Sequence, residues 1–113
     1  MVEVATIREI PTYPETPRYD LRVVAGERAY LLDVDYVGAE DRWYVKLSTA
    51  EGEPIAGPQK VVCDVPMFRR KAHDPRLPQT GYFVFLTLDA RGLAEPPGWL
   101  DFGRRVRLYL RDG

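Results

Sequence analysis

The 113-residue sequence has very few of the side chains from which most catalytic and metal sites are built. It contains one cysteine, Cys63, and one histidine, His73. A single cysteine excludes an internal disulfide framework and any site made of several thiolates. A single histidine removes most zinc-enzyme and histidine-relay designs. Glycine loops for phosphates and serine nucleophile motifs are missing too. We therefore expect no cofactor, no metal and no enzymatic activity.

Long apolar runs and an excess of one charge are also missing. No stretch approaches the roughly 20 apolar residues that cross a bilayer. The first four residues lack the basic and apolar zones of a signal peptide. The 16 basic and 17 acidic residues nearly balance, which argues against a nucleic-acid coat or a polybasic membrane binder. These features predict a soluble, intracellularly made protein that has no membrane partner. They also disfavour nucleic acid as a binding partner.

What the chain does contain is hydrophobic residues, at 45%, together with ten prolines and nine glycines. A single domain of this length buries roughly two-thirds of its unfolded surface and folds without disulfides. The many prolines and glycines predict frequent turns rather than long helices.

The first 18 residues are predicted to form an extended, proline-bounded arm or edge strand. Pro11, Pro14 and Pro17 exclude a helix here, because proline lacks the amide donor and biases its predecessor towards extended conformations. Such a stretch suits an edge strand or an arm lying on a neighbour. A polyproline-like tether fits equally well. We assign residues 19–113 to the main domain.

Apolar and polar residues alternate along 19–48, as expected for half-buried strands. Turns are predicted at 25–27 and 38–41, where Gly26 and Gly38 lie. Three strands joined by short turns form an antiparallel meander.

The second half of the chain is predicted from weaker signals. We expect a turn at 49–57, a short strand at 60–63, and a short helical turn at 64–69 that Asp64 caps. Tyr82 to Leu88 is apolar on both faces, which indicates a central strand or one covered by a partner. A loop at 90–103 and a strand at 104–111 follow. The expected fold is all-β: a small antiparallel β-barrel or β-sandwich of six to seven strands, with an extended N-terminal arm and at most one short helix.

Two pairs of residues are candidates for chemistry. Asp33 and Asp35 project from the same face of a strand and are placed to act as an acid/base pair or to hold calcium. We favour a solvated face on which arginines such as Arg22, Arg28 and Arg42 pair with the carboxylates. Cys63 and His73 lack any local signature of a nucleophile and its base, and Cys63 is expected to be a small buried side chain.

Charge is uneven between the two halves of the chain. Residues 1–57 hold six basic and eleven acidic residues, a net charge of −5, and residues 58–113 hold ten and six, a net charge of +4. Arg69, Arg70 and Lys71 form the one compact basic run. A nucleic-acid site would be expected to have aromatic residues among the basic ones, and only Phe68 lies beside this run. We therefore favour a protein-docking surface over a nucleic-acid site. Trp43 is expected in the core, whereas Trp99 is expected either to pack back on the core or to mark a contact.

The sequence resembles the small baseplate plug proteins of contractile-tailed bacteriophages, a family first defined on a cyanophage baseplate. The resemblance is carried by an ordered series of short segments that covers nearly the whole chain. No single motif is catalytic, and the order and spacing of the segments carry the resemblance. The matching segments are residues 5–11, 24–30, 41–45, 51–55, 74–81 and 100–109.

The resemblance implies a structural part of the virion tail, assembled in the host cytoplasm. It implies packing against hub, tail-tube, sheath-initiator or wedge proteins in several copies around a symmetric ring, where the chain helps to plug or brace the baseplate. No catalytic residues are carried over. The alternative is a stand-alone β-barrel module that binds carbohydrate or single-stranded nucleic acid. The residues predicted to contact partners are Thr6, Ile7, Ile10, Phe68, Arg69, Arg70, Lys71, Trp99, Arg105 and Arg107.

Overall fold

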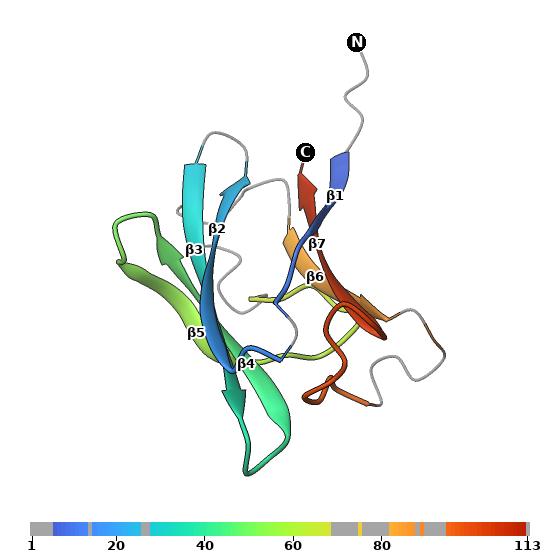
Figure 1. Cartoon of the computed structure of the whole chain (residues 1–113). Helices are drawn as coiled ribbons and strands as arrows, with labels where there is room; N and C mark the ends of the chain where they lie inside the picture. The colour runs from blue at the N-terminus through green and yellow to red at the C-terminus, as the bar shows by residue number, and fades with distance from the viewer. Residues whose placement is uncertain are drawn as a thin grey trace.

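The protein is all-β, and its described residues form seven strands in two antiparallel sheets (Figure 1). The computed structural model describes residues 6–13, 15–25, 28–68, 75, 82–87, 89 and 95–112, and these contain no helix. The predicted fold class and strand number are confirmed. The strands are β1 (Thr6–Ile10), β2 (Arg18–Ala25), β3 (Arg28–Val37), β4 (Arg42–Thr49), β5 (Pro54–Lys60), β6 (Tyr82–Thr87) and β7 (Val106–Asp112).

The predicted meander is the first part of a four-stranded sheet with the order β2-β3-β4-β5. Its inward side chains are the apolar members of the alternation, and Leu32, Val34 and Leu47 are at most 1% exposed. Alternation at a period of two therefore placed one face of each strand in the core. Gly26 and Glu27, at the tip of the first predicted turn, lie outside the described residues.

Strand β5 lies where we predicted a turn. Pro54 to Lys60 pairs with β4, whereas the short strand had been expected at 60–63. The prolines misled the prediction, since Pro54 is the first residue of an edge strand and Pro58 lies within a register shift, where it has no partner on β4. Both positions tolerate the missing amide donor, because an edge strand uses only one side of its backbone in the sheet.

The second sheet has three strands in the order β1-β7-β6. Strand β1 lies at the edge of this sheet, and its partner is the chain's own last strand, with Thr6 opposite Asp112 and Ile10 opposite Leu108. Strand β7 begins at Val106 rather than at Arg104, because Gly103 to Arg105 form a turn.

Strand β6 is an edge strand rather than the central one, and this chain itself covers it. The segment 61–68 runs along its outer edge, where the amides of Asp64 and Met67 donate to the carbonyls of Phe85 and Phe83 at 2.7 and 2.8 Å. Phe83, Val84 and Phe85 are all buried, so the apolar character of both faces needs no second subunit.

The short helical turn predicted at 64–69 is wrong for its described part. Asp64 and Phe68 have φ angles of 64° and 63°. Two left-handed residues so close together interrupt any right-handed helical turn. The segment instead serves as an extended cover for β6.

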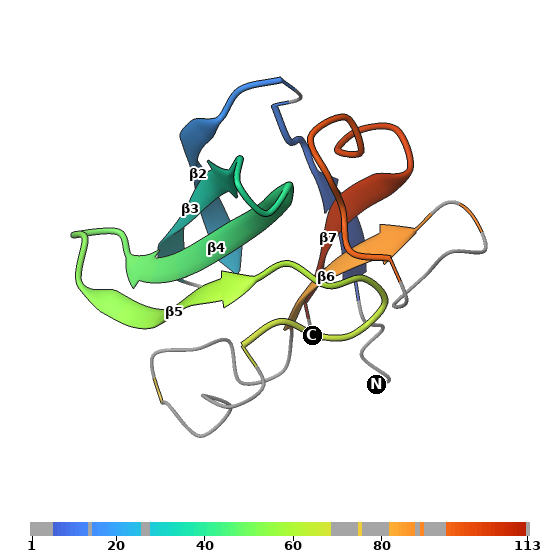
Figure 2. The ribbon, with the colours of Figure 1, turned by 90° about the horizontal axis from the view of Figure 1, so that it is seen from below.

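The two sheets face each other across one hydrophobic core and do not close into a barrel, so the barrel alternative is wrong (Figure 2). Trp43, Phe102 and Phe85 are almost fully buried between them. On one side, the edges of β1 and β2 are bridged by a hydrogen bond from the Arg8 guanidinium to the Val24 carbonyl. Within the described residues, no helix has the length and hydropathy needed to span a membrane.

Candidate functional site: protein-docking surfaces

The outer face of the four-stranded sheet carries charges of both signs in register. Asp20 on β2 lies opposite Asp33 on β3, and Asp33 lies opposite Lys46 on β4. The Lys46 Nζ is 3.6 Å from Asp33 Oδ2. The Asp33 carboxylate therefore pairs with a cation on the neighbouring strand. We had predicted such cross-strand ion pairs, but with arginines rather than with Lys46. Of these, Arg28 and Arg42 donate to the Pro75 and Asp41 carbonyls at 2.7 Å.

Asp20 and Asp33 form a directly opposed pair of like charges. A hydrogen bond between the two side chains raises the pKa of Asp20, and burial and repulsion act in the same direction. Like charges directly opposite each other on neighbouring strands destabilise a sheet. This pair is consequently a weak point of the outer face.

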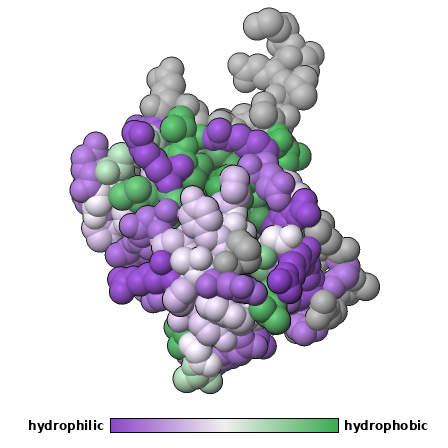
Figure 3. Space-filling view, viewed as in Figure 1, coloured by the Kyte–Doolittle hydropathy of each residue, from purple (hydrophilic) through white to green (hydrophobic). Residues whose placement is uncertain are grey.

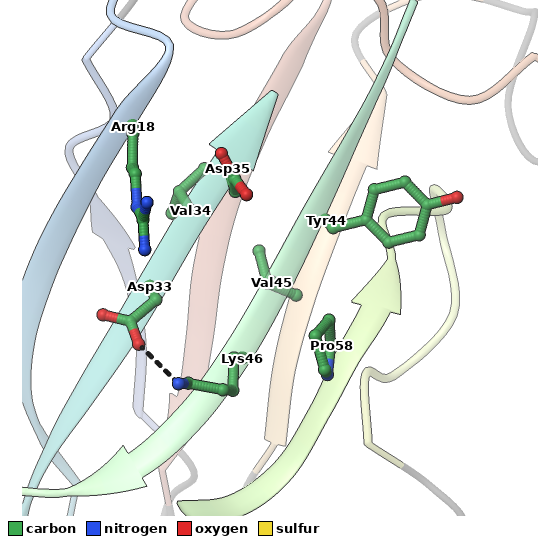
Figure 4. A pocket seen from close by; sticks show the side chains of 8 residues that line it. All are labelled: Arg18, Asp33, Val34, Asp35, Tyr44, Val45, Lys46 and Pro58. Atoms are coloured by element: carbon green, nitrogen blue, oxygen red, sulfur yellow. Dashed lines mark ion pairs between the residues drawn. The ribbon is translucent and has the colours of Figure 1, made fainter. Parts of the chain in front are cut away.

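A shallow pocket of about 120 Å³ lies on this face (Figure 4). Asp33 and Asp35 both line it, as the predicted shared face requires, but Asp33 points to Lys46 while Asp35 lies farther along β3. A volume below about 300 Å³ is smaller than usual ligand sites. Among the described residues no three ligating side chains form a metal cluster. The full lining is Arg18, Asp33, Val34, Asp35, Tyr44, Val45, Lys46 and Pro58.

Cys63 is a buried core residue, as predicted. It is 0% exposed, and burial raises the pKa of its thiol to about 11. The thiol is therefore protonated at neutral pH and is no nucleophile. His73, its hypothetical base, lies outside the described residues.

The two tryptophans stack at one end of the sandwich. Their ring centroids are 5.7 Å apart with planes 4° from parallel, and the Trp43 Nε1 donates to the Gly98 carbonyl at 2.8 Å. Trp43 is fully buried, as predicted, and Trp99 is half-buried. The neighbouring Leu100 is 50% exposed. Trp99 therefore packs back on the core and remains partly exposed, and its role as a contact stays a prediction.

Asp41 ties the segment 95–103, which contains Trp99 and which we call the tryptophan loop, to the β3–β4 turn. Its Oδ1 accepts hydrogen bonds from the Tyr36 hydroxyl at 2.6 Å and from the Trp99 amide at 3.0 Å. The hydrogen bonds from these two donors lower the pKa of Asp41, and the bond to the Asp41 carboxylate raises the pKa of Tyr36. Tyr36 in turn packs on Trp99, with ring centroids 4.7 Å apart. The loop is therefore presented in one conformation.

Arg105, a predicted contact residue, points inwards. Its side chain is 4% exposed, and its Nη2 donates to Asp101 Oδ2 at 3.0 Å. The same nitrogen reaches the carbonyls of Glu95 and Pro96 at 2.9 and 3.2 Å. Asp101 also accepts the Gly98 amide at 2.7 Å. Arg105 thus ties both ends of the tryptophan loop together rather than facing a partner.

The other predicted contact residues are scattered. Ile7 is 66% exposed, whereas Ile10 and Phe68 are buried. Thr6 opens β1, and Arg107 lies on the outer face of β7. Arg69, Arg70 and Lys71 lie outside the described residues, as does most of the segment 74–81.

Two half-buried tyrosines and an exposed arginine share a face with Arg107, and none of the three was among the predicted contact residues. Tyr82, on β6, lies opposite Arg111, and Tyr109 lies between Arg111 and Arg107 on β7. The alternation in 104–111 contained this signal for β7. The pairing of β7 with β1 and β6 did not follow from the local pattern.

A family model described as the cyanophage baseplate Pam3 plug gp18 matches residues 7–113. The match begins at the second residue of β1 and runs to the end of the chain, so it includes both sheets and the tryptophan loop. No curated protein matches the chain.

Proposed function

Because the chain belongs to the family of the cyanophage baseplate Pam3 plug gp18, we propose that it packs against hub, tail-tube, sheath-initiator or wedge proteins of a contractile-tail baseplate and helps to plug or brace it. Its structural role in a phage baseplate, and hence its location in the virion tail, follow from the family. The named partners, the several copies in a symmetric ring and assembly in the host cytoplasm are our proposal. The observation that carries the proposal is the family match over 7–113.

A rigid two-sheet body supports this role. A part held in a symmetric assembly needs surfaces that keep their shape, because ordering them on binding costs free energy. The tryptophan loop is held by Asp41, by Arg105 and by the Trp43 indole. Its exposed tip, Leu100, is therefore presented without further ordering.

Exposed large apolar residues on separate elements support contacts on more than one side. Ile7, on β1, is 66% exposed and Leu100, in the tryptophan loop, is 50% exposed. Burial of apolar surface is the dominant favourable term in most protein–protein association. A brace must join at least two neighbours, and this distribution suits that purpose.

Quantitative mass spectrometry of purified tails tests the proposal. Tails of the phage that encodes this chain are separated from free protein on a density gradient, and the chain is quantified against the tail-tube protein. We expect the chain at one fixed ratio across tail-containing fractions, cross-linked to hub, tube, initiator or wedge proteins. A chain found only among unassembled proteins would overturn the proposal.

A further inference from the structure

The outer face of the three-stranded sheet gathers arginine, tyrosine and aliphatic side chains, and we call it the arginine–tyrosine face. The register brings these side chains together, since Arg111 lies opposite both Ile7 and Tyr82, and Arg107 lies opposite Leu86. Residues directly opposite each other in antiparallel strands share a face. The face consists of Ile7, Glu9, Tyr82, Val84, Leu86, Arg107, Tyr109 and Arg111.

These side chains point away from the core. Leu108 and Leu110, which alternate with them on β7, are 0% exposed. On the outer side, Arg111 is exposed and Tyr109 is half-buried, while Ile7 is 66% exposed. The face is thus a mixed apolar and basic surface on a rigid sheet.

The apolar part continues onto the neighbouring sheet edge. Val24 at the end of β2 is 49% exposed, and Arg8 of β1 donates to its carbonyl, so the two strands are close there. Figure 3 shows hydrophobic side chains gathered at the end of the molecule where β1 begins and β2 ends. Ile7 and Val24 are the exposed large apolar residues of these two strands.

The charge of the face is positive. The Arg107 Nε lies 3.6 Å from Glu9 Oε1, so that pair is close to neutral. The Arg111 guanidinium lies 5.7 Å from the centre of the Tyr82 ring, and no carboxylate of the described residues forms an ion pair with it. A cation held over an aromatic ring is already partly oriented and needs only an anion to complete its contacts.

We propose that the arginine–tyrosine face docks on a neighbouring baseplate protein whose surface presents a carboxylate among aliphatic side chains. The carboxylate pairs with Arg111, and the aliphatic groups cover Ile7, Tyr82 and Tyr109. Tyrosine and arginine are enriched where protein partners meet, and complementary charge sets the orientation. A second copy fits less well, because two positive faces repel. The proposal rests on the proposed baseplate role.

The test compares two variants of the whole chain, each with one arginine replaced by glutamate so that the charge at that position is reversed. Each variant is expressed in place of the native chain during phage assembly. Arg111→Glu reverses the charge of the arginine–tyrosine face, and Arg22→Glu makes the same change at an exposed position on β2. Circular dichroism first establishes that both variants fold. We expect Arg111→Glu to lower the number of chains per purified tail by roughly tenfold or more, and Arg22→Glu to leave it near the native value.

A photo-cross-linking amino acid in place of Tyr109 provides a second readout that does not depend on the charge reversal. In assembled tails we expect it to couple to a different baseplate protein, at a peptide containing aspartate or glutamate. Native incorporation of Arg111→Glu, or coupling of position 109 to another copy of this chain, would overturn the docking proposal and leave the baseplate role intact. Absence of the native chain from tails would overturn both.

Discussion

At the scale of single residues, the outer face of the four-stranded sheet contains one unfavourable contact. The carboxyls of Asp20 and Asp33 oppose each other directly, and their hydrogen bond raises the pKa of Asp20. A carboxyl whose pKa is raised by folding favours the folded state when it is protonated. That contribution is complete below the unfolded pKa of about 4 and is lost as the pH rises through the folded pKa. At neutral pH the repulsion remains.

Replacing Asp20 by asparagine should therefore stabilise the protein at neutral pH. We expect Asp20→Asn to raise the free energy of unfolding at pH 7 by about 0.2–1 kcal/mol, the range for opposed side chains on neighbouring strands. The gain should shrink below about pH 4, where the native carboxyl is protonated. Urea unfolding at both pH values measures it. Asp35→Asn, opposite Arg18, is the matched control and should give no gain.

Cys63 is a second residue for which the structure predicts a chemical property, the reactivity of its thiol. Because burial raises the pKa of its thiol to about 11, the folded protein at pH 8 should react with a thiol reagent about a hundredfold more slowly than a free cysteine does. In guanidinium chloride the same thiol should react at the ordinary rate. Equal rates in the folded and unfolded chain would show that the thiol is accessible.

At the scale of elements, the tryptophan loop depends on one buried cation. Arg105→Met keeps most of the side-chain volume but removes the donors to Asp101, Glu95 and Pro96. Left without these donors, the loop should lose about 1–3 kcal/mol of stability. Chemical unfolding followed by tryptophan fluorescence measures this loss. Arg104→Met is the control, since Arg104 is 61% exposed and should contribute little. Equal stability of the two variants would contradict the role of Arg105.

Strand β5 and the turn before it contain a matched pair of glycines. Gly57 and Gly52 both have positive φ angles, 90° and 91°. A Cβ at Gly57 would lie 2.6 Å from the Val45 carbonyl oxygen, whereas one at Gly52 would meet no atom within 4 Å. Gly52→Ala should therefore cost about 1 kcal/mol for backbone strain alone, and Gly57→Ala distinctly more. Thermal unfolding of both variants separates strain from collision, and equal losses would exclude the collision.

The elements that were predicted correctly are those with local signals. Alternation and short turns were sufficient for β2, β3 and β4, because neighbouring strands of a meander pair in sequence order. Strand β5 was missed because its prolines resemble turn signals, although an edge strand tolerates them. The pairing of β1 with β7 joins the two ends of the chain, and no local pattern contains it.

The candidate site was predicted less completely than the fold. Arg105 follows the same alternation as Arg107, so the sequence placed both at the surface, and the turn before Val106 directed Arg105 inwards. The exposure of Ile7 was expected. The face that Ile7 forms with Tyr82 and Arg111 depends on strand pairing, which is known only from the structure.

At the scale of the whole molecule, the opposed charges of the two halves are partly used inside the chain. Glu9 and Glu15, from the acidic half, pair with Arg107 and Arg104 of the basic half at 3.6 and 3.7 Å. These exposed pairs contribute little stability. Because they neutralise charges of both halves, they reduce the difference in charge that the surface presents. We therefore expect docking to depend on individual faces of the sheets rather than on one acidic and one basic half.

As a structural part of a phage baseplate, this chain is expected to contact other baseplate proteins in the assembled tail. A cryo-electron microscopy map of the assembled tail of the phage that encodes it tests this most directly. We predict density for the two-sheet sandwich inside the baseplate, with the arginine–tyrosine face covered by a neighbouring protein. A complete baseplate map in which every density is accounted for by other proteins would contradict the account.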